Sequence, residues 1–396
     1  MIEVYSKALD SSLKVDRILG KIEGIKPGPT VVFFGGIHGN ETSGVFALKD
    51  ALAGINNTYV KGTIYGISGN LKALKENKRY IENDLNRLWT KQQIQKIRNK
   101  TVLNEDELEL VELFNLLNDI LETNTSPFYF IDLHTTSSKT LPFITINDAL
   151  INRKFSEQFP VPIVLGIEEY LNGPLLSYIN QMGYVSLGFE SGQHDDFSAI
   201  TNSIAFVYLT LVYSGVLKEE AVINFSKYHE QLKQHAKNKN AVFEVIYLYK
   251  IEKKEHFKML NGFKSFERIK KGTKLAISNA VEISAPFTGS IFMPLYQKRG
   301  AEGFFIIKPI KPILLKISAV LRRLKTDTLL AWLPGVSWVN KTEGSLQVNL
   351  TIAKFLAKPL FHLLGYRNRQ ITNTHLMLNN RERVAKTKIY KREPWY

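Results

Sequence analysis

The chain has 396 residues, enough for two or three domains, and its 44% hydrophobic and 22% charged content suits a globular protein with a sizeable core. It contains no cysteine, which excludes disulfides, thiolate metal sites and a cysteine nucleophile, so any metal must be held by His, Asp or Glu. The net charge is +15, but residues 313–396 alone hold 15 Lys or Arg against 4 Asp or Glu. Residues 1–312 are therefore close to balanced in charge, which argues against nucleic-acid binding by this part of the chain.

Residues 1–17 lack the apolar segment of a secretory signal. No stretch of the chain is apolar over the roughly 18 residues that a membrane-spanning helix needs. We therefore expect a cytoplasmic protein without a transmembrane segment.

The first 240 residues alternate between strand-like and helix-like segments. Residues 31–34 form an apolar run followed by a Gly pair, which predicts a buried strand that ends in a tight turn. The apolar spacing of residues 41–52 then predicts a helix capped by Thr42 or Ser43. The further strands expected are 62–70, 127–136, 141–146, 160–166 and 184–191, and the further helices are 104–122, 202–217 and 221–238. This alternation indicates an α/β sheet, which binds ligands at the carboxyl ends of its strands.

The pattern of residue types changes after residue 240. Residues 241–312 contain β-type runs separated by Gly, Pro and Asn, which predicts a small all-β domain. Residues 313–396 form a basic extension that combines helix-like apolar spacing over 351–366 with a polar, basic end. We therefore divide the chain into an α/β domain over 1–240, a β domain over 241–312 and an extension of unknown role over 313–396.

Residues of the types that bind metal ions lie at the ends of two predicted strands. His38 and Glu41 follow the first strand and are three positions apart, and His134 ends a later one. A hydrolytic zinc site needs three protein ligands and one open position for water, and these three residues can supply the ligands. Asp132 and Thr135 are close enough in sequence to orient His134. Taken alone, each pair is also consistent with a solvated turn.

Two further segments carry polar groups suited to amide chemistry. Arg79, Asn86 and Arg87 could hold a substrate carboxylate and stabilise an oxyanion, or belong to an ordinary charged loop. Glu190 ends an apolar run, and burial would raise its pKa into the range of a general base. A structural salt bridge is the alternative for Glu190, and His194 is expected only near the site.

Four segments together carry a resemblance to a known family. GGIHGNETSG (35–44), RYIENDLNR (79–87), IDLHTT (131–136) and GFES (188–191) resemble the successive motifs of the succinylglutamate desuccinylase/aspartoacylase family, a branch of the zinc carboxypeptidase-like proteins. Residues 285–303 look like part of that family's C-terminal β domain, so the resemblance covers residues 25–312 and leaves out the extension. It implies a zinc carboxypeptidase-like mixed central sheet flanked by helices, with a smaller C-terminal β domain.

The resemblance also implies a role for each candidate residue. One Zn²⁺ per chain would be bound by His38, Glu41 and His134. Glu190 would activate the metal-bound water and pass its proton to the leaving amine, and Arg79 would polarise the scissile carbonyl. Asn86 and Arg87 would bind the α-carboxylate of a small N-acyl amino acid.

The chain departs from the aspartoacylase pattern at the positions that bind the second carboxylate. Asn180 stands where that branch has an Arg shortly before the catalytic Glu, and Phe304 stands at the Tyr of the β domain, with Tyr296 as a candidate substitute. Buried polar recognition groups give strong selectivity, so we expect an amide hydrolase whose substrate is not N-acetylaspartate.

Other functions remain open at this point. A zinc carboxypeptidase or a deacylase of peptides, amines or esters is the alternative enzyme, and a non-catalytic member of the family is the alternative class. The extension, with Trp332, Trp338 and Trp395 among basic residues, suggests either a surface for anionic lipid or nucleic acid, or a helical appendage that packs on the body or forms a homo-oligomer contact. We favour the appendage, with no nucleic-acid partner.

Overall fold

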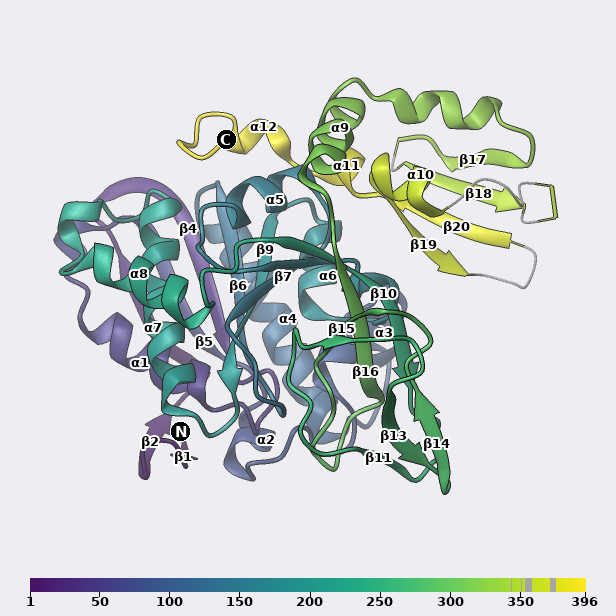
Figure 1. Ribbon diagram of the computed structural model, residues 1–396. Coiled ribbons are helices and arrows are strands. Elements are labelled where there is room, and N and C mark those ends of the chain that lie inside the picture. The colour runs from purple at the N-terminus through teal and green to yellow at the C-terminus, as the bar shows by residue number, and fades with distance from the viewer. Residues whose placement is uncertain (343, 350, 353–357, 371–374) are drawn as a thin grey trace.

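A mixed eleven-stranded sheet forms the centre of the molecule (Figure 1). The computed structural model describes residues 1–342, 344–349, 351–352, 358–370 and 375–396. The strand order is β12-β15-β16-β10-β8-β7-β9-β6-β4-β5-β3, and β5, β4, β6 and β9 run parallel to one another. These sheet strands are β3 (Ile18–Glu23), β4 (Lys26–Gly35), β5 (Lys61–Ser68), β6 (Phe128–Thr136), β7 (Phe143–Ile146), β8 (Ile163–Leu165), β9 (Val185–Gln193), β10 (Val242–Lys250), β12 (Arg268–Ile269), β15 (Gly289–Phe292) and β16 (Glu302–Pro309).

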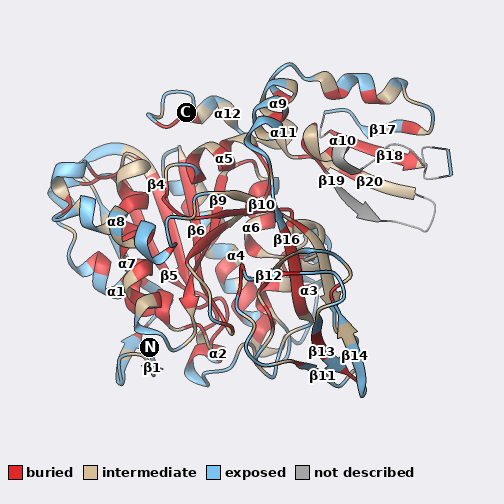
Figure 2. Cartoon of the chain, in the orientation of Figure 1, coloured by how far each residue is buried: buried red, intermediate tan, exposed pale blue. Residues whose placement is uncertain are grey.

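Helices cover both faces of this sheet (Figures 1 and 2). Alternate residues of β4 divide between two cores, because successive side chains of a strand point to opposite faces: Val31 and Phe33 belong to one core, Val32 and Phe34 to the other. The first core is covered by α1 (Ser43–Ala53), α5 (Leu150–Ser156), α7 (Phe197–Tyr213) and α8 (Phe225–His235), and the second by α3 (Lys91–Arg98), α4 (Glu105–Thr123) and α6 (Leu175–Gln181). The expected mixed α/β sheet flanked by helices is therefore confirmed.

Local signals explain several element boundaries. The helix expected over 104–122 is α4, which begins with a capping box in which Asn104 and Glu107 bond to each other's backbone N–H. The helix expected over 41–52 is α1, but the Thr42 side chain makes no capping hydrogen bond. Short elements complete this region: the hairpin β1 (Ile2–Ser6) and β2 (Ser11–Val15), and α2 (Leu71–Lys75).

The region after residue 240 consists of strands, as expected, but it is not separate from the central sheet. Strand β10 pairs in parallel with β8, and β16, β15 and β12 continue the same sheet beyond it. A small second sheet, β11 (Phe257–Met259), β13 (Lys274–Ser278) and β14 (Val281–Ser284), packs beside them.

The extension contains a sheet, so the expectation of a helical appendage is wrong. Its four antiparallel strands are β17 (Val336–Asn340), β18 (Ser345–Asn349), β20 (His375–Asn380) and β19 (Tyr366–Gln370), in that spatial order. Helix α9 (Pro312–Arg323), the 3₁₀ segment η5 (Thr326–Trp332) and α10 (Lys358–Leu363) accompany them. Part of the helix-like spacing over 351–366, residues 353–357, lies outside the described residues.

The last residues return to the body through α11 (Arg381–Val384) and α12 (Thr387–Tyr390). Tyr390 is fully buried, donates its hydroxyl proton to the carbonyl oxygen of Phe128 and accepts the N–H of Val185 at 3.0 Å. These are the first residues of β6 and β9, so the C-terminal segment ties the two strands together at their beginnings. Among the described helices, none is long and apolar enough to cross a membrane.

Candidate active site

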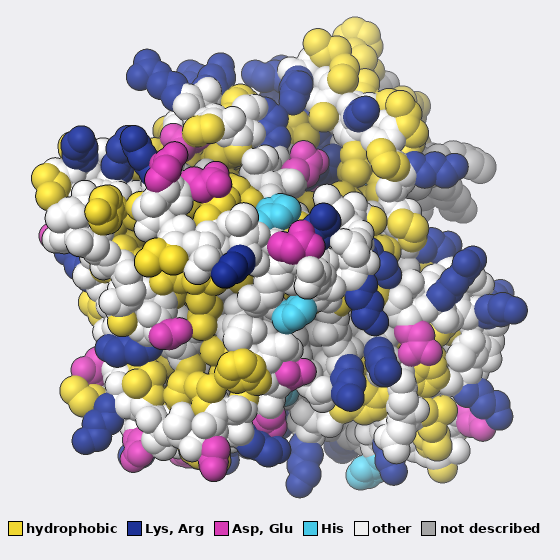
Figure 3. Space-filling model, turned by 60° about the vertical axis from the view of Figure 1, so that its left-hand side comes forward, with side chains coloured by type: hydrophobic (Ala, Val, Ile, Leu, Met, Phe, Trp, Pro, Cys, Tyr) yellow, Lys and Arg dark blue, Asp and Glu magenta, His cyan; other side chains and the backbone are white. Residues whose placement is uncertain are grey.

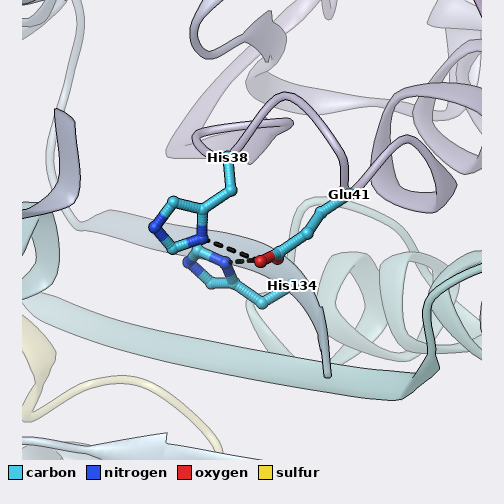
Figure 4. A group of neighbouring side chains, drawn as sticks. All are labelled: His38, Glu41 and His134. Atoms are coloured by element: carbon cyan, nitrogen blue, oxygen red, sulfur yellow. Dashed lines mark hydrogen bonds and ion pairs between the residues drawn. The ribbon is translucent and has the colours of Figure 1, made fainter. Parts of the chain in front are cut away.

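Three predicted ligands converge at the carboxyl ends of two adjacent strands (Figure 4). His38 and Glu41 lie in the loop between β4 and α1, and His134 lies near the end of β6. The Glu41 carboxylate sits between the two imidazoles, with Oε1 2.8 Å from His38 Nδ1 and Oε2 2.9 Å from His134 Nδ1. All three side chains are buried, and one ligand atom from each lies within 4.8 Å of the others. The structure thus brings together residues that are 96 positions apart in sequence.

Glycine makes this loop geometry accessible. Gly36 has φ of +76°, a left-handed conformation that a side chain would strain. A Cβ on Gly35 would lie 2.8 Å from the backbone of Gly44, so the start of α1 can approach β4 only if this position is glycine. The Gly pair that precedes His38 therefore fixes both the turn and the helix approach.

His134 is oriented from its other ring nitrogen. Its Nε2 lies 2.7 Å from Oδ2 of Asp132, which is fully buried two residues earlier on the same strand face. Although burial opposes it, the carboxylates of Asp132 and Glu41 hold the pKa of His134 well above its usual range. The backbone N–H of Thr135 also donates to Glu41, at 3.0 Å. This pattern leaves His134 Nδ1 facing the centre of the group.

A second carboxylate, absent from the predicted set, supports His38 and Arg79. Asp84 Oδ1 lies 3.1 Å from His38 Nε2, and its Oδ2 accepts from Arg79 Nη2 at 3.1 Å and Nε at 3.2 Å. Although burial opposes it, Arg79 and His38 hold the pKa of Asp84 well below its usual range. Arg79 Nη1 lies 3.6 Å from Glu41 Oε1, so the guanidinium reaches the group.

The segment that carries Asp84 is held by a buried aspartate. Both carboxylate oxygens of Asp106 accept backbone N–H groups of residues 81–83, and Oδ1 also accepts from Asn70. Asp106 is fully buried on the first turn of α4. The loop between α2 and α3 is therefore fixed although it has little regular structure.

Glu190 lies beside the metal-type group, on the neighbouring strand. It pairs in register with His134 across β9 and β6, and its side chain is 8% exposed. Its Oε2 is buried and has no hydrogen-bond partner among the described residues. Burial raises the pKa of Glu190 to about 8, and the negative charges of Glu41 and Asp132 add to this rise. Such a carboxyl group can exchange a proton near neutral pH.

His194 lies next to the group without joining it. Its Nδ1 is 2.7 Å from the Thr135 hydroxyl and its Nε2 is 3.2 Å from Gln297 Oε1. Burial lowers the pKa of His194. This imidazole is held by neutral partners and lines the same cavity as the three ligands.

Asn86 and Arg87 also line the cavity, and both have protein partners. Asn86 Oδ1 accepts the backbone N–H of Leu175 at 2.9 Å. Arg87 Nη2 and Nε donate to Oε1 of Glu302 at 2.8 and 3.2 Å. Sequence reasoning missed Glu302, which begins β16 and is 215 residues from Arg87. Its only signal was a place in the segment that resembles the family's β domain.

The structure does not bring Tyr296, Phe304 or Asn180 to the cavity. The Tyr296 hydroxyl donates to the carbonyl oxygen of Leu260 at 2.8 Å and accepts the N–H of Phe263 at 3.1 Å, so it closes a loop of the β region. Phe304 is fully buried in the core of that region, and Asn180 is buried in α6. The assignment of Tyr296 to substrate binding therefore has no support from this geometry.

An open cavity lies in front of the site. Its lining includes His38, Glu41 and His134 together with Glu190, Arg79 and Arg87. Much of the remaining wall is apolar, formed by Ile146, Ile167, Leu171, Leu176, Leu295 and Phe305. This lining suits a small molecule that has a polar, reactive part and an apolar part.

The donor set fits a zinc ion. Two imidazole nitrogens and a carboxylate, all buried and converging from two elements, are the ligand types and number of a catalytic zinc site with an open position. Both histidines carry a carboxylate on their second nitrogen, as metal-bound histidines commonly do.

Comparison with known proteins gives consistent results. Residues 27–207 match the family model described as the succinylglutamate desuccinylase/aspartoacylase catalytic domain. A probable aspartoacylase of Acaryochloris marina is 33% identical over 124 residues, which cover 31% of this chain and 40% of that protein. A succinylglutamate desuccinylase of Photorhabdus laumondii is 31% identical over 112 residues, which cover 27% and 33%. The matches therefore span less than half of these relatives.

Solved structures support the fold. A succinylglutamate desuccinylase/aspartoacylase from Rhodobacter sphaeroides superposes with a TM-score of 0.55 at 15% identity, covering 74% of this chain and 88% of that one. A succinylglutamate desuccinylase from Vibrio cholerae gives 0.52 at 15% identity, covering 77% and 95%. The broader likeness to zinc carboxypeptidases stays a prediction. Residues 27–207, somewhat less than half of the chain, are therefore similar to the catalytic domain of the succinylglutamate desuccinylase/aspartoacylase family.

Proposed function

We propose that this chain is a zinc-dependent hydrolase that cleaves the amide bond of a small N-acyl amino acid. The observation that carries the proposal is the convergence of His38, Glu41 and His134 beside a buried, unpartnered Glu190 carboxylate oxygen. Zinc bound there would supply Lewis-acid polarisation and a water molecule that ionises near neutral pH.

Glu190 is the proton carrier of the proposed reaction. Its raised pKa allows it to take a proton from the attacking water and to give one to the leaving amine at the same pH. Its position opposite His134 in the strand register holds the carboxylate beside the reacting atoms without a competing protein partner.

Arg79 stabilises the negative charge that develops on the carbonyl oxygen. Two hydrogen bonds that its guanidinium donates to Asp84 fix its position before substrate arrives, so little reorganisation is needed during the reaction. Loss of one such donor typically lowers kcat by roughly 100- to 1000-fold.

Asn86 and Arg87 bind the carboxylate of the amino-acid product. Asn86 is anchored through its carbonyl oxygen, which leaves its NH₂ group for a ligand, and Arg87 is oriented by Glu302. An Arg fork matches a carboxylate with two parallel hydrogen bonds.

The rest of the substrate is proposed to be uncharged and apolar. Among the described lining residues, the Arg cations are Arg79 and Arg87, and the proposed reaction already uses both, Arg79 for the carbonyl oxygen and Arg87 for the amino-acid carboxylate. A second substrate carboxylate would lose water without gaining a free cation, which is unfavourable in a buried site. The apolar wall of the cavity instead suits a hydrocarbon group, which agrees with the expectation that N-acetylaspartate is not the substrate.

The test is a substrate panel with zinc-loaded protein. N-acetyl derivatives of leucine and phenylalanine should be hydrolysed, with N-acetylaspartate and N-succinylglutamate much poorer substrates. Glu190→Gln should keep zinc and lose turnover, while Glu220→Gln, an exposed control, should change neither. An unchanged rate in Glu190→Gln would remove this residue from the mechanism. Hydrolysis of peptides or esters alone would favour the zinc carboxypeptidase or esterase alternative, and no hydrolysis of any member would favour a non-catalytic protein.

A further inference from the structure

The outer face of α9 carries an exposed row of large aliphatic side chains. Ile313, Ile317, Val320 and Leu324 follow one another at helical spacing and are 58%, 41%, 53% and 69% exposed. Leu314, Leu329 and Trp332 extend the row onto η5, and Trp332 is 84% exposed. We call these seven residues the apolar ridge. Helices of globular proteins normally turn their apolar face toward the core, whereas α9 turns its row of aliphatic side chains toward solvent.

The opposite face of α9 is fixed, so the helix cannot turn to bury the ridge. Ser318 donates to the carbonyl oxygen of Leu363 at 2.7 Å. Arg322, whose side chain is fully buried, donates to Asp148 Oδ2 at 2.8 Å and to Glu382 Oε1 at 3.2 Å. Rotation would leave these buried charges unpaired, which is strongly unfavourable. The ridge is therefore a constant feature of the surface.

The segment of sequence that carries the ridge is rich in Lys and Arg and poor in acidic residues. Residues 308–341 contain seven Lys or Arg and a single acid, Asp327, which is buried and bonded to Tyr366. Six of the seven cations are exposed: Lys308, Lys311, Lys316, Arg323, Lys325 and Lys341. Arg323 and Lys325 also line one groove with Lys388 and Lys391 of the C-terminal segment. Figure 3 shows hydrophobic side chains and Lys or Arg side by side along the upper edge of the molecule.

We propose that the apolar ridge and its cations dock on the surface of a lipid bilayer that contains anionic headgroups. Aliphatic and Trp side chains enter the boundary between headgroups and acyl chains, and flanking Lys and Arg bind the lipid charges. A nucleic acid would use the cations but not the aliphatic row. A second copy of this chain would bring the same positive charges to the contact, which opposes self-association.

Docking through the ridge leaves the catalytic cavity unchanged. None of the seven ridge residues is among those that line the cavity. The face is thus a means of locating the protein at a membrane, and its test does not depend on the proposed hydrolase function.

The experiment is vesicle flotation of the full chain. Vesicles of phosphatidylcholine alone are compared with vesicles that contain about 30% phosphatidylserine, at low and high salt. We expect binding to the anionic vesicles that weakens with salt. Since each Lys or Arg near such a surface contributes about fivefold in affinity, Lys316→Gln with Arg323→Gln should weaken binding by roughly tenfold or more. Ile317→Ser, Val320→Ser and Leu324→Ser together should weaken it by at least about tenfold.

Matched controls use equally exposed residues away from the ridge. Val102→Ser with Ile223→Ser, at 80% and 84% exposure, and Lys253→Gln with Lys254→Gln should bind like the unaltered chain. Failure of the unaltered chain to float with anionic vesicles at low salt would overturn the proposal. Binding of the triple Ser variant that equals binding of the unaltered chain would also overturn it. A dimer seen in sedimentation equilibrium and dissociated by the triple Ser variant would do the same, because the ridge would then be a contact between copies.

Discussion

Replacing Glu190 by Gln separates the stability of the fold from its proposed chemistry. The Glu190 side chain is 8% exposed, one of its oxygens lacks a partner among the described residues, and burial raises its pKa to about 8. Gln has nearly the same shape and no charge. The variant therefore removes the unfavourable burial of a carboxylate together with the proposed proton carrier.

The magnitude follows from the shifted pKa. An unfolded chain releases the Glu190 proton near the ordinary value of 4.5, whereas the folded chain keeps it up to about 8. Between these values the folded state binds more protons than the unfolded state, so the free energy of unfolding falls by about 1.4 kcal/mol per pH unit as pH rises. The gap of about 3.5 units sets an upper limit of about 5 kcal/mol for the stability lost by pH 8. Because Gln does not release a proton, the Glu190→Gln variant should not lose this stability as pH rises.

The assay is urea unfolding of metal-free protein, with chelator present, at about pH 5, 6.5 and 8. We expect Glu190→Gln to match the unaltered chain at the lowest pH and to exceed its stability increasingly toward pH 8. Glu3→Gln, an exposed carboxylate on β1, is the matched control. A difference between Glu190→Gln and the unaltered chain that is independent of pH would refute the reasoning, because the stabilisation would then not come from the charge.

Four other predictions test the zinc site and the packing around it. Metal analysis should find one zinc per chain, and a chelator should abolish hydrolysis until zinc is restored, because in the proposed reaction the metal would activate the attacking water. Asp132→Asn should weaken zinc affinity by roughly 10- to 100-fold in a calorimetric titration, because His134 loses its carboxylate partner. Arg87→Lys should raise KM for N-acyl amino acids with little change in kcat, because a Lys cannot bind a carboxylate in two places. Tyr390→Phe should lower the free energy of unfolding by about 1–3 kcal/mol, because the buried Val185 N–H loses its acceptor, while turnover per folded molecule stays unchanged.

The metal-type group was predictable because each part of it is local. A spacing of three places His38 and Glu41 in one turn after a strand, and Asp132 and His134 share a strand face by the period of two. The parallel order of β4, β6 and β9 then brings these strand ends together. The strands and the rule that ligands collect at their carboxyl ends made this group a candidate, and the four family-like motifs favoured it over solvated turns.

The partners of these residues were not predictable, because they depend on long-range packing. Asp84 lies within the RYIENDLNR motif (79–87), but its two oxygens reach His38 and Arg79 only because Asp106 fixes the loop. Glu302 meets Arg87 because β16 joins the central sheet, a pairing that no local pattern of β-type runs indicates. The compartment, the oligomeric state and the separation into three domains stay predictions.

The extension shows a different limit of sequence reasoning. A basic composition and helix-like apolar spacing suggested a helical appendage, but β17, β18, β19 and β20 pair into a sheet. The end of the chain is part of the body's own core: Tyr390 is fully buried, and Trp395 Nε1 donates to the Tyr129 hydroxyl at 3.1 Å. Periodicity could not reveal this, because the segment is short and its partners are more than 200 residues away.

This packing decides how membrane docking can be tested. Deleting residues 313–396 would remove the ridge, but it would also remove the Tyr390 hydroxyl that links the first residues of β6 and β9. Those strands carry His134 and Glu190, so a truncated chain could lose zinc, turnover and vesicle binding together through a single structural defect. Point substitutions on the exposed ridge leave these contacts intact. Only they can separate the proposed docking surface from a segment that holds the candidate active site together.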